Sequence, residues 1–221
     1  MQRVGEIRAT ARAARSRRGG GVIGNLRLTA LTGVFLIVLL AVEGATIPWL
    51  QPLLTVHIFV GMLLLGPVAL KLGATGYRFL RYYAGSPGYV EKGPPAPLMR
   101  LVVAPVLVFS TLMLFGTGVG LLAFGNVGML SLLHKASFIV WFGATAVHVL
   151  VYAARAARYA LAERTSSRIG GTAMRAGLLL ASIVIGLGVA FATLPQARSW
   201  RHPGPGHHGI ASSAQHSRMP E

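Results

Sequence analysis

The 221-residue chain contains no cysteine. This absence excludes disulfide bonds, thiolate metal sites and cysteine-ligated iron–sulfur clusters, and it removes any evidence about the redox compartment. A redox centre in this protein must therefore use histidine, methionine or a bound organic cofactor. The sequence also shows no glycine-rich nucleotide motif, no soluble catalytic domain and no internal repeat that would divide it. Any substrate chemistry would then belong to a partner.

Charged residues are also scarce, at 12% of the chain, and only five of them are acidic against 21 basic ones. A hydrophobic content of 53% and a mean hydropathy of +0.61 are too high for an ordinary soluble domain of this length. The basic residues stand between apolar segments and form no stripe, so the net charge of +16 indicates membrane topology and not nucleic-acid binding. We therefore predict an integral membrane protein in contact with lipid.

Five apolar segments, each near the roughly 20 residues that a membrane-spanning helix needs, predict an all-α bundle of five transmembrane helices. They cover residues 28–47, 52–75, 98–124, 128–154 and 176–194. The expected organisation is a retained basic cytoplasmic tail at 1–25, the helix bundle at 26–195 and a disordered extracytoplasmic tail at 196–221. The glycine- and proline-rich connection at 82–97 is predicted to contain no helix.

The distribution of basic residues predicts the orientation. Arginine and lysine precede the first span and occupy residues 71–100 and 155–175, whereas the turns at 48–51 and 125–129 contain neither. The positive-inside rule places the N-terminus in the cytoplasm and the C-terminus outside. The expected location is the cell (inner or cytoplasmic) membrane, with several passes.

Three histidines lie inside apolar spans, where an ionisable side chain is costly unless it faces the bundle interior and binds something. His57 is five residues past Pro52 and His134 is six past Gly128. Both spans run from outside to inside, so the two imidazoles should lie at the same level near the outer face. A pair at matched depth on different helices suits axial ligation of a haem iron. The alternative is that each histidine bonds a nearby carbonyl or serine as packing.

Other ionisable residues sit near these histidines by the same count of depth. His148 follows His134 by 14 residues, which puts it on the same helix face and about 21 Å deeper, with Trp141 halfway between them. Lys71 occupies the matching position on the second span and could reach the cytoplasmic interface, lie beside a haem propionate or, less favourably, serve as an axial ligand. Glu43 is at the right depth to orient a ligand histidine or carry a proton, or it could simply be solvated.

This pattern resembles the membrane-embedded b-type cytochrome subunits of formate dehydrogenases and nickel–iron hydrogenases, which have a four-helix haem core. In that family the fourth span carries two histidines with thirteen residues between them, as His134 and His148 do here. The outer one pairs with a histidine early in the second span, which His57 matches. The family's other haem takes a ligand from the first span, but residues 26–47 contain no histidine. The resemblance covers about the first 160 residues and leaves out the fifth span and the tail.

The resemblance implies an electron-transfer subunit of an oxidoreductase complex, carrying electrons between the quinone pool and a redox protein partner. It implies one haem b with His57 and His134 as axial iron ligands, a second haem at His148 without a clear partner, and a quinone site. Two other functions fit the residues. One is a proton-coupled carrier that uses the histidines and Glu43, and the other is a cofactor-free anchor or assembly subunit.

Overall fold

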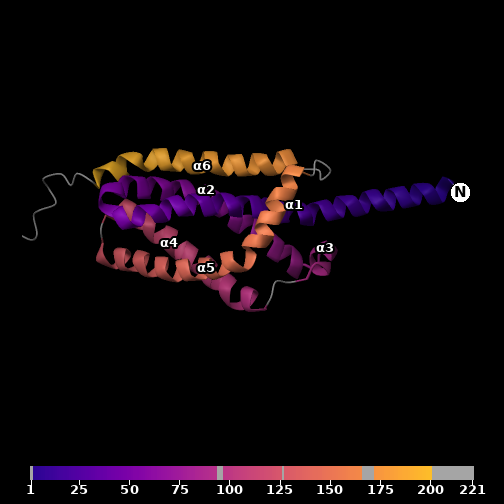
Figure 1. Ribbon diagram of the computed structural model, residues 1–221, viewed down its shortest axis with the longest axis horizontal. Coiled ribbons are helices and arrows are strands. Elements are labelled where there is room, and N and C mark those ends of the chain that lie inside the picture. Colours follow the sequence, from indigo (N-terminus) through magenta and orange to yellow (C-terminus); the bar gives the residue numbers. More distant parts are fainter. Residues whose placement is uncertain (1, 94–96, 126, 166–171, 201–221) are drawn as a thin grey trace, which may run out of the picture.

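The computed structural model describes residues 2–93, 97–125, 127–165 and 172–200, and these form helices joined by short turns, with no strand among them (Figure 1). The fold class is therefore all-α, as predicted. The elements are α1 (Gln2–Thr46), the 3-10 turn η1 (Ile47–Trp49), α2 (Leu50–Tyr83), α3 (Pro87–Glu91), the π-helical turn η2 (Met99–Val103), α4 (Ala104–Phe124), α5 (Gly128–Thr165) and α6 (Thr172–Ser199).

Four helical segments of the described chain are long and apolar enough to cross a membrane, which makes this a multi-pass membrane protein. They are Gly21–Tyr83, Met99–Phe124, Gly128–Ala153 and Thr172–Ser199. The first contains 63 residues and reverses at η1, because α1 and α2 lie side by side (Figure 1). Two of the five predicted spans, 28–47 and 52–75, lie within this one segment. Large apolar side chains such as Phe109 and Leu150 are 68% and 82% exposed, as contact with lipid requires.

The two tight turns of the bundle lie at the same end, which we call the Trp49 end. At η1, Pro48 lacks the N–H that would continue α1, and the chain reverses into α2. At the close of α4, Gly125 adopts a φ of +83°, a conformation that glycine takes without steric cost. The opposite end, which we call the Tyr89 end, holds α3, where the ring of Tyr89 packs edge-on against Tyr77 at 6.2 Å.

Three predicted boundaries differ from the structure. The connection at 82–97 does contain a short helix, α3, because Pro87 stands in its first turn, where the fixed φ of proline favours helix. The basic tail at 1–25 is helical from Gln2 and continues directly into the first span, forming the long arm in Figure 1. Helix α6 continues through Pro195 to Ser199, and the predicted disordered tail from 201 onward lies outside the described residues.

The helices form two layers, with α1, α2 and α6 in one and α4 and α5 in the other (Figure 1). Helix α6 packs most extensively against α2, and glycine makes this contact possible. A Cβ atom on Gly66 would lie 2.0 Å from the Ser182 carbonyl oxygen, and one on Gly186 would lie 2.1 Å from the Leu63 carbonyl oxygen. The two backbones therefore touch, so the fifth span is an integral part of the layer that carries His57.

This contact predicts that Gly66→Ala lowers the free energy of unfolding by about 1–3 kcal/mol, the usual cost of overpacking a filled interior. Thermal or denaturant unfolding of the detergent-solubilised protein measures it. Gly73→Ala is the matched control on the same helix, since a Cβ there meets nothing within 4 Å. The control should gain up to about 1 kcal/mol from helix propensity. Equal stability of the two variants would contradict the backbone contact.

Candidate cofactor site

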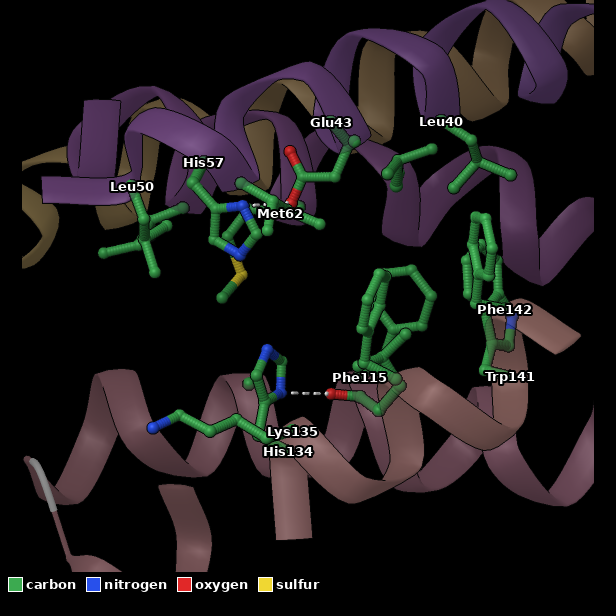
Figure 2. A pocket seen from close by; sticks show the side chains of 18 of the residues that line it. Leu40, Glu43, Leu50, His57, Met62, Phe115, His134, Lys135, Trp141 and Phe142 are labelled. Carbon is green, nitrogen blue, oxygen red and sulfur yellow. Dashed lines mark hydrogen bonds and ion pairs between the residues drawn. The ribbon is translucent and has the colours of Figure 1, made fainter. Parts of the chain in front are cut away.

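A cavity of about 700 Å³ lies between the two layers, and its lining includes Ile47, Pro48 and Leu50 at the Trp49 end (Figure 2). This volume is within the range of roughly 300–1,000 Å³ that small-molecule and cofactor sites occupy. Its walls are mostly apolar and come from α1, α2, α4 and α5. The residues with polar side chains other than tryptophan that line it are Glu43, His57, Ser131, His134, Lys135 and Thr145. A few polar groups in an apolar cavity are typical of a binding site.

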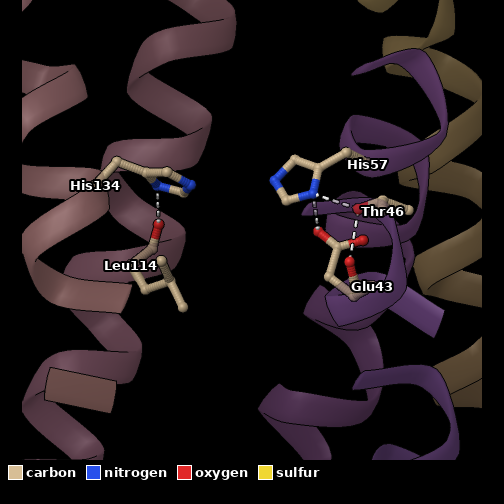
Figure 3. Close-up of polar contacts among 5 residues, drawn as sticks. All are labelled: Glu43, Thr46, His57, Leu114 and His134. Carbon is tan, nitrogen blue, oxygen red and sulfur yellow. Dashed lines mark hydrogen bonds and ion pairs between the residues drawn. The ribbon is translucent and has the colours of Figure 1, made fainter. Parts of the chain in front are cut away.

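His57 projects from α2 into this cavity and is held by two groups of α1. Its Nδ1 lies 3.1 Å from Glu43 Oε1 and 2.9 Å from Thr46 Oγ1 (Figure 3). The Thr46 hydroxyl donates to the Glu43 carbonyl oxygen at 2.6 Å, so its oxygen is left to accept from the imidazole. The side chains of His57 and Glu43 are only 22% and 16% exposed. The last turn of α1 therefore orients the imidazole on α2.

His134 projects from α5 into the same cavity and is held by α4. Its Nδ1 lies 3.1 Å from the Leu114 carbonyl oxygen and 3.2 Å from Thr117 Oγ1. The Thr117 hydroxyl itself donates to the carbonyl oxygens of Met113 and Leu114, at 2.6 and 3.1 Å. Gly118 keeps α4 close to the ring, because a Cβ there would lie 3.2 Å from His134 Cε1.

The partners of the two rings determine which nitrogens carry protons. A carbonyl oxygen can only accept a hydrogen bond, so His134 Nδ1 must donate to Leu114 and carry the proton. His57 Nδ1 likewise faces the Thr46 oxygen, whose own proton is donated to the Glu43 backbone carbonyl, so Nδ1 must donate to it. Each neutral ring is then left with an unprotonated Nε2, which is the form that binds a metal.

The two Nε2 atoms point toward each other across the cavity (Figure 3). The two rings are also within electrostatic range of each other, although His57 lies on α2 and His134 on α5. Among the described residues, no group of three or more histidine, aspartate or glutamate side chains could hold a metal ion by itself. Within the described residues, a bare metal ion between the two imidazoles would therefore find only these two ligands.

The structure separates His148 from this cavity. Its ring packs against Tyr152 at 4.9 Å, and it does not line the cavity, whereas Trp141 does. Lys71, the residue of matching depth on α2, has its contacts on α1. Its ammonium donates to the Thr29 carbonyl oxygen, and it lies against Gly33, where a Cβ would be 2.8 Å from Nζ. Lys71 is thus bonded to α1 near the start of the first predicted span.

Sequence reasoning missed four groups of this site. Thr46 could have been found, since it follows Glu43 by three residues and so shares its helix face. Lys135 could have been found because it adjoins His134, and Figure 2 shows its side chain extending toward the Trp49 end of the cavity. Nothing in the sequence marks the Leu114 carbonyl or Thr117 as partners of His134, because that contact depends on how α4 and α5 pack.

Comparisons of the chain with protein-family models, with curated proteins and with solved structures find no match.

Proposed function

We propose that the protein is a b-type membrane cytochrome, an electron-transfer subunit that connects the quinone pool with a redox protein partner. The observation that carries this proposal is the pair of unprotonated Nε2 atoms that face each other across one apolar cavity (Figure 3). His57 and His134 would be the axial ligands of one haem b. The resemblance to the cytochrome subunits of formate dehydrogenases and nickel–iron hydrogenases supports the same pair of ligands.

The residues present fit a haem in four respects. Two neutral imidazoles are available on opposite walls, and each has its other nitrogen bonded within its own layer. The cavity walls are mainly aliphatic and aromatic, as a macrocycle needs. The buried Glu43 Oε2 atom has no hydrogen-bond partner, which is expected where a ligand completes the site. Lys135 supplies a positive charge at the Trp49 end, where it could pair with a propionate (Figure 2).

When bound, the haem would supply one-electron chemistry. The protein's own contribution is to hold both imidazoles in one tautomer, to exclude water with apolar walls and to place the site near one end of the bundle. The cavity lining also includes Thr145, about three turns after His134 on α5, and its buried hydroxyl has no hydrogen-bond partner. This hydroxyl could donate to a carbonyl of a quinone ring, so we place the candidate quinone site there.

The proposal includes the finer topology. The segment Gly21–Tyr83 would cross the membrane twice, which gives five crossings in all, with the N-terminus in the cytoplasm. The Trp49 end would then face outward in the cytoplasmic membrane, and the haem would exchange electrons with a partner on that side. His148 and Lys71 would hold no second haem, because Lys71 is bonded to α1 and no first-span histidine completes an inner pair.

The contact between Glu43 and His57 also suits a proton-coupled carrier. In such a carrier the imidazole would exchange protons at Nε2 with water in the cavity, but the apolar walls give that water few partners. An absorbance spectrum separates a cytochrome from both a carrier and a cofactor-free anchor subunit. Flux measured in proteoliposomes then separates the carrier from the anchor.

We predict that the protein purified after haem-replete expression shows the reduced-minus-oxidised spectrum of a six-coordinate b-type haem, with one haem per chain. His57→Ala and His134→Ala should each keep less than about a tenth of that haem, since even the loss of an outer-shell partner weakens metal sites 10–100-fold. His148→Ala is the matched control on the same helix as His134 and should keep it. Wild-type protein without haem would rule out the cytochrome, and full haem in His57→Ala would rule out the ligand pair.

Gly118 offers a finer test of His134. In Gly118→Ala the added methyl group must displace the ring, because it would lie 3.2 Å from Cε1. We expect haem to be retained roughly tenfold less tightly, as measured by its transfer to an excess of a haem-binding acceptor protein. Gly116→Ala, two residues away and open to space, should bind haem as the wild type does. Equal loss in both variants would show that α4 does not position the ring.

The absence of cysteine makes the topology directly testable, because single cysteines can be labelled without background. A membrane-impermeant maleimide applied to intact cells or right-side-out vesicles should label Gln51→Cys and Ser213→Cys but not Ser86→Cys. Permeabilisation should then expose Ser86→Cys. Protection of Ser213→Cys together with Ser86→Cys would indicate an even number of crossings and contradict five.

A further inference from the structure

The two imidazoles of the site differ in the charge of their partners. His57 Nδ1 faces a carboxylate, Glu43, at 3.1 Å, whereas His134 Nδ1 faces a neutral carbonyl and a neutral hydroxyl. A hydrogen bond from an imidazole to a carboxylate is charge-assisted and stronger than one to a neutral acceptor. The pair of ligands is therefore symmetric in residue type but asymmetric in electronic character.

Glu43 and Thr46, one turn apart at the end of α1, both contact the same imidazole nitrogen of His57. Thr46 bonds the Glu43 carbonyl oxygen and the same imidazole nitrogen, so it ties the acid and the base to one turn of α1. On α2, Gly61 stands one turn after His57 and faces the carboxylate without a side chain, since a Cβ there would lie 3.4 Å from Glu43 Oε1. The acid thus has a built position and is not simply a solvated group near the surface.

The surroundings leave the charge of Glu43 poorly compensated. Among the described residues that line the cavity, only Lys135 carries a fixed positive charge, and it extends toward the Trp49 end from the opposite layer (Figure 2). Glu43 Oε2 is buried and has no hydrogen-bond partner. A carboxyl group in such a low-dielectric setting ionises only beside a compensating positive charge, and a ferric haem iron on His57 would supply that charge.

We propose that Glu43 is a positioning residue that sets the redox potential of the site through His57. This inference rests on the proposed function, because it needs a haem on His57. A carboxylate that accepts the Nδ1 proton makes the imidazole a stronger electron donor, and outer-shell hydrogen bonds of this kind tune bound metals. The extra negative charge favours ferric over ferrous iron. Glu43 therefore lowers the midpoint potential, and the neutral partners of His134 do so far less.

The test compares midpoint potentials of haem-loaded wild type, Glu43→Gln and Thr117→Val by spectroelectrochemical titration at one fixed pH. Glu43→Gln keeps an oxygen acceptor for Nδ1 but removes the charge, and it should shift the equilibrium toward reduced haem at least tenfold, which is 59 mV for one electron. Thr117→Val removes a neutral partner from the other ring and should shift it less than threefold. The low-spin six-coordinate spectrum should be unchanged in both.

The outcomes distinguish this inference from the proposed function. Suppose that every variant binds haem and that the reduction equilibrium of Glu43→Gln lies within threefold of wild type. That result would overturn the role of Glu43 and leave the proposed cytochrome function intact. Loss of haem from Glu43→Gln alone would also overturn it, because Glu43 would then be needed for binding and not for the potential. Absence of haem from the wild type would instead overturn the proposed function. If Glu43→Gln does not accumulate, Glu43→Asp replaces it, because its shorter side chain moves the carboxyl group away from His57. The ratio of reduced to oxidised haem should then rise at least threefold at a given potential.

Discussion

The structure depends on one constraint, the cost of leaving a polar group without a partner where no water can reach it. Lipid offers no hydrogen bonds, so each ionisable side chain inside a span must find its partner within the protein. Glu43 and His57 bond each other, His134 bonds a backbone carbonyl, and Lys71 bonds the carbonyl of Thr29. These contacts determine which helices lie next to one another and where each side chain points. Three buried threonines, Thr32, Thr111 and Thr117, meet the same constraint by bonding carbonyls of their own helix.

The site depends on the bundle in a second way, through residues that have no side chain. Gly66 and Gly186 let α6 rest directly on the backbone of α2 and so fix the helix that carries His57. Gly118 on α4 likewise lets that helix lie close to the ring of His134 on α5. The chain thus uses glycine to bring rigid elements close together and uses polar contacts to orient the side chains between them. The cavity is what remains between two layers that are each tightly packed internally.

Much of the fold could be predicted from the sequence, because hydropathy over about 20 residues reports directly on helices that cross a membrane. Depth counting also placed His57 and His134 at one level, since helix rise is nearly constant, and both do line one cavity. It could not give the partners of His134, which come from the packing of α4 on α5. Nor could it show that Lys71 bonds α1, because the reach of a flexible side chain is not encoded in spacing. The helix ends at Gln2 and Ser199 were missed, because hydropathy detects apolar segments and not the polar turns by which a helix extends beyond them.

The hydrogen-bond partners of the two cavity histidines come from the helix that precedes each of them in the chain. His57 is held by residues of α1, the helix made just before its own, and His134 is held by α4, again the preceding helix. Each hairpin therefore contains the hydrogen-bond partners of its own histidine as soon as its second helix has been synthesised. The α1–α2 pair can enter the bilayer complete before α4 exists, and the α4–α5 pair can follow in the same way. A cofactor held between His57 and His134 would cross-link these two hairpins, and α6, made last, completes the layer that carries His57.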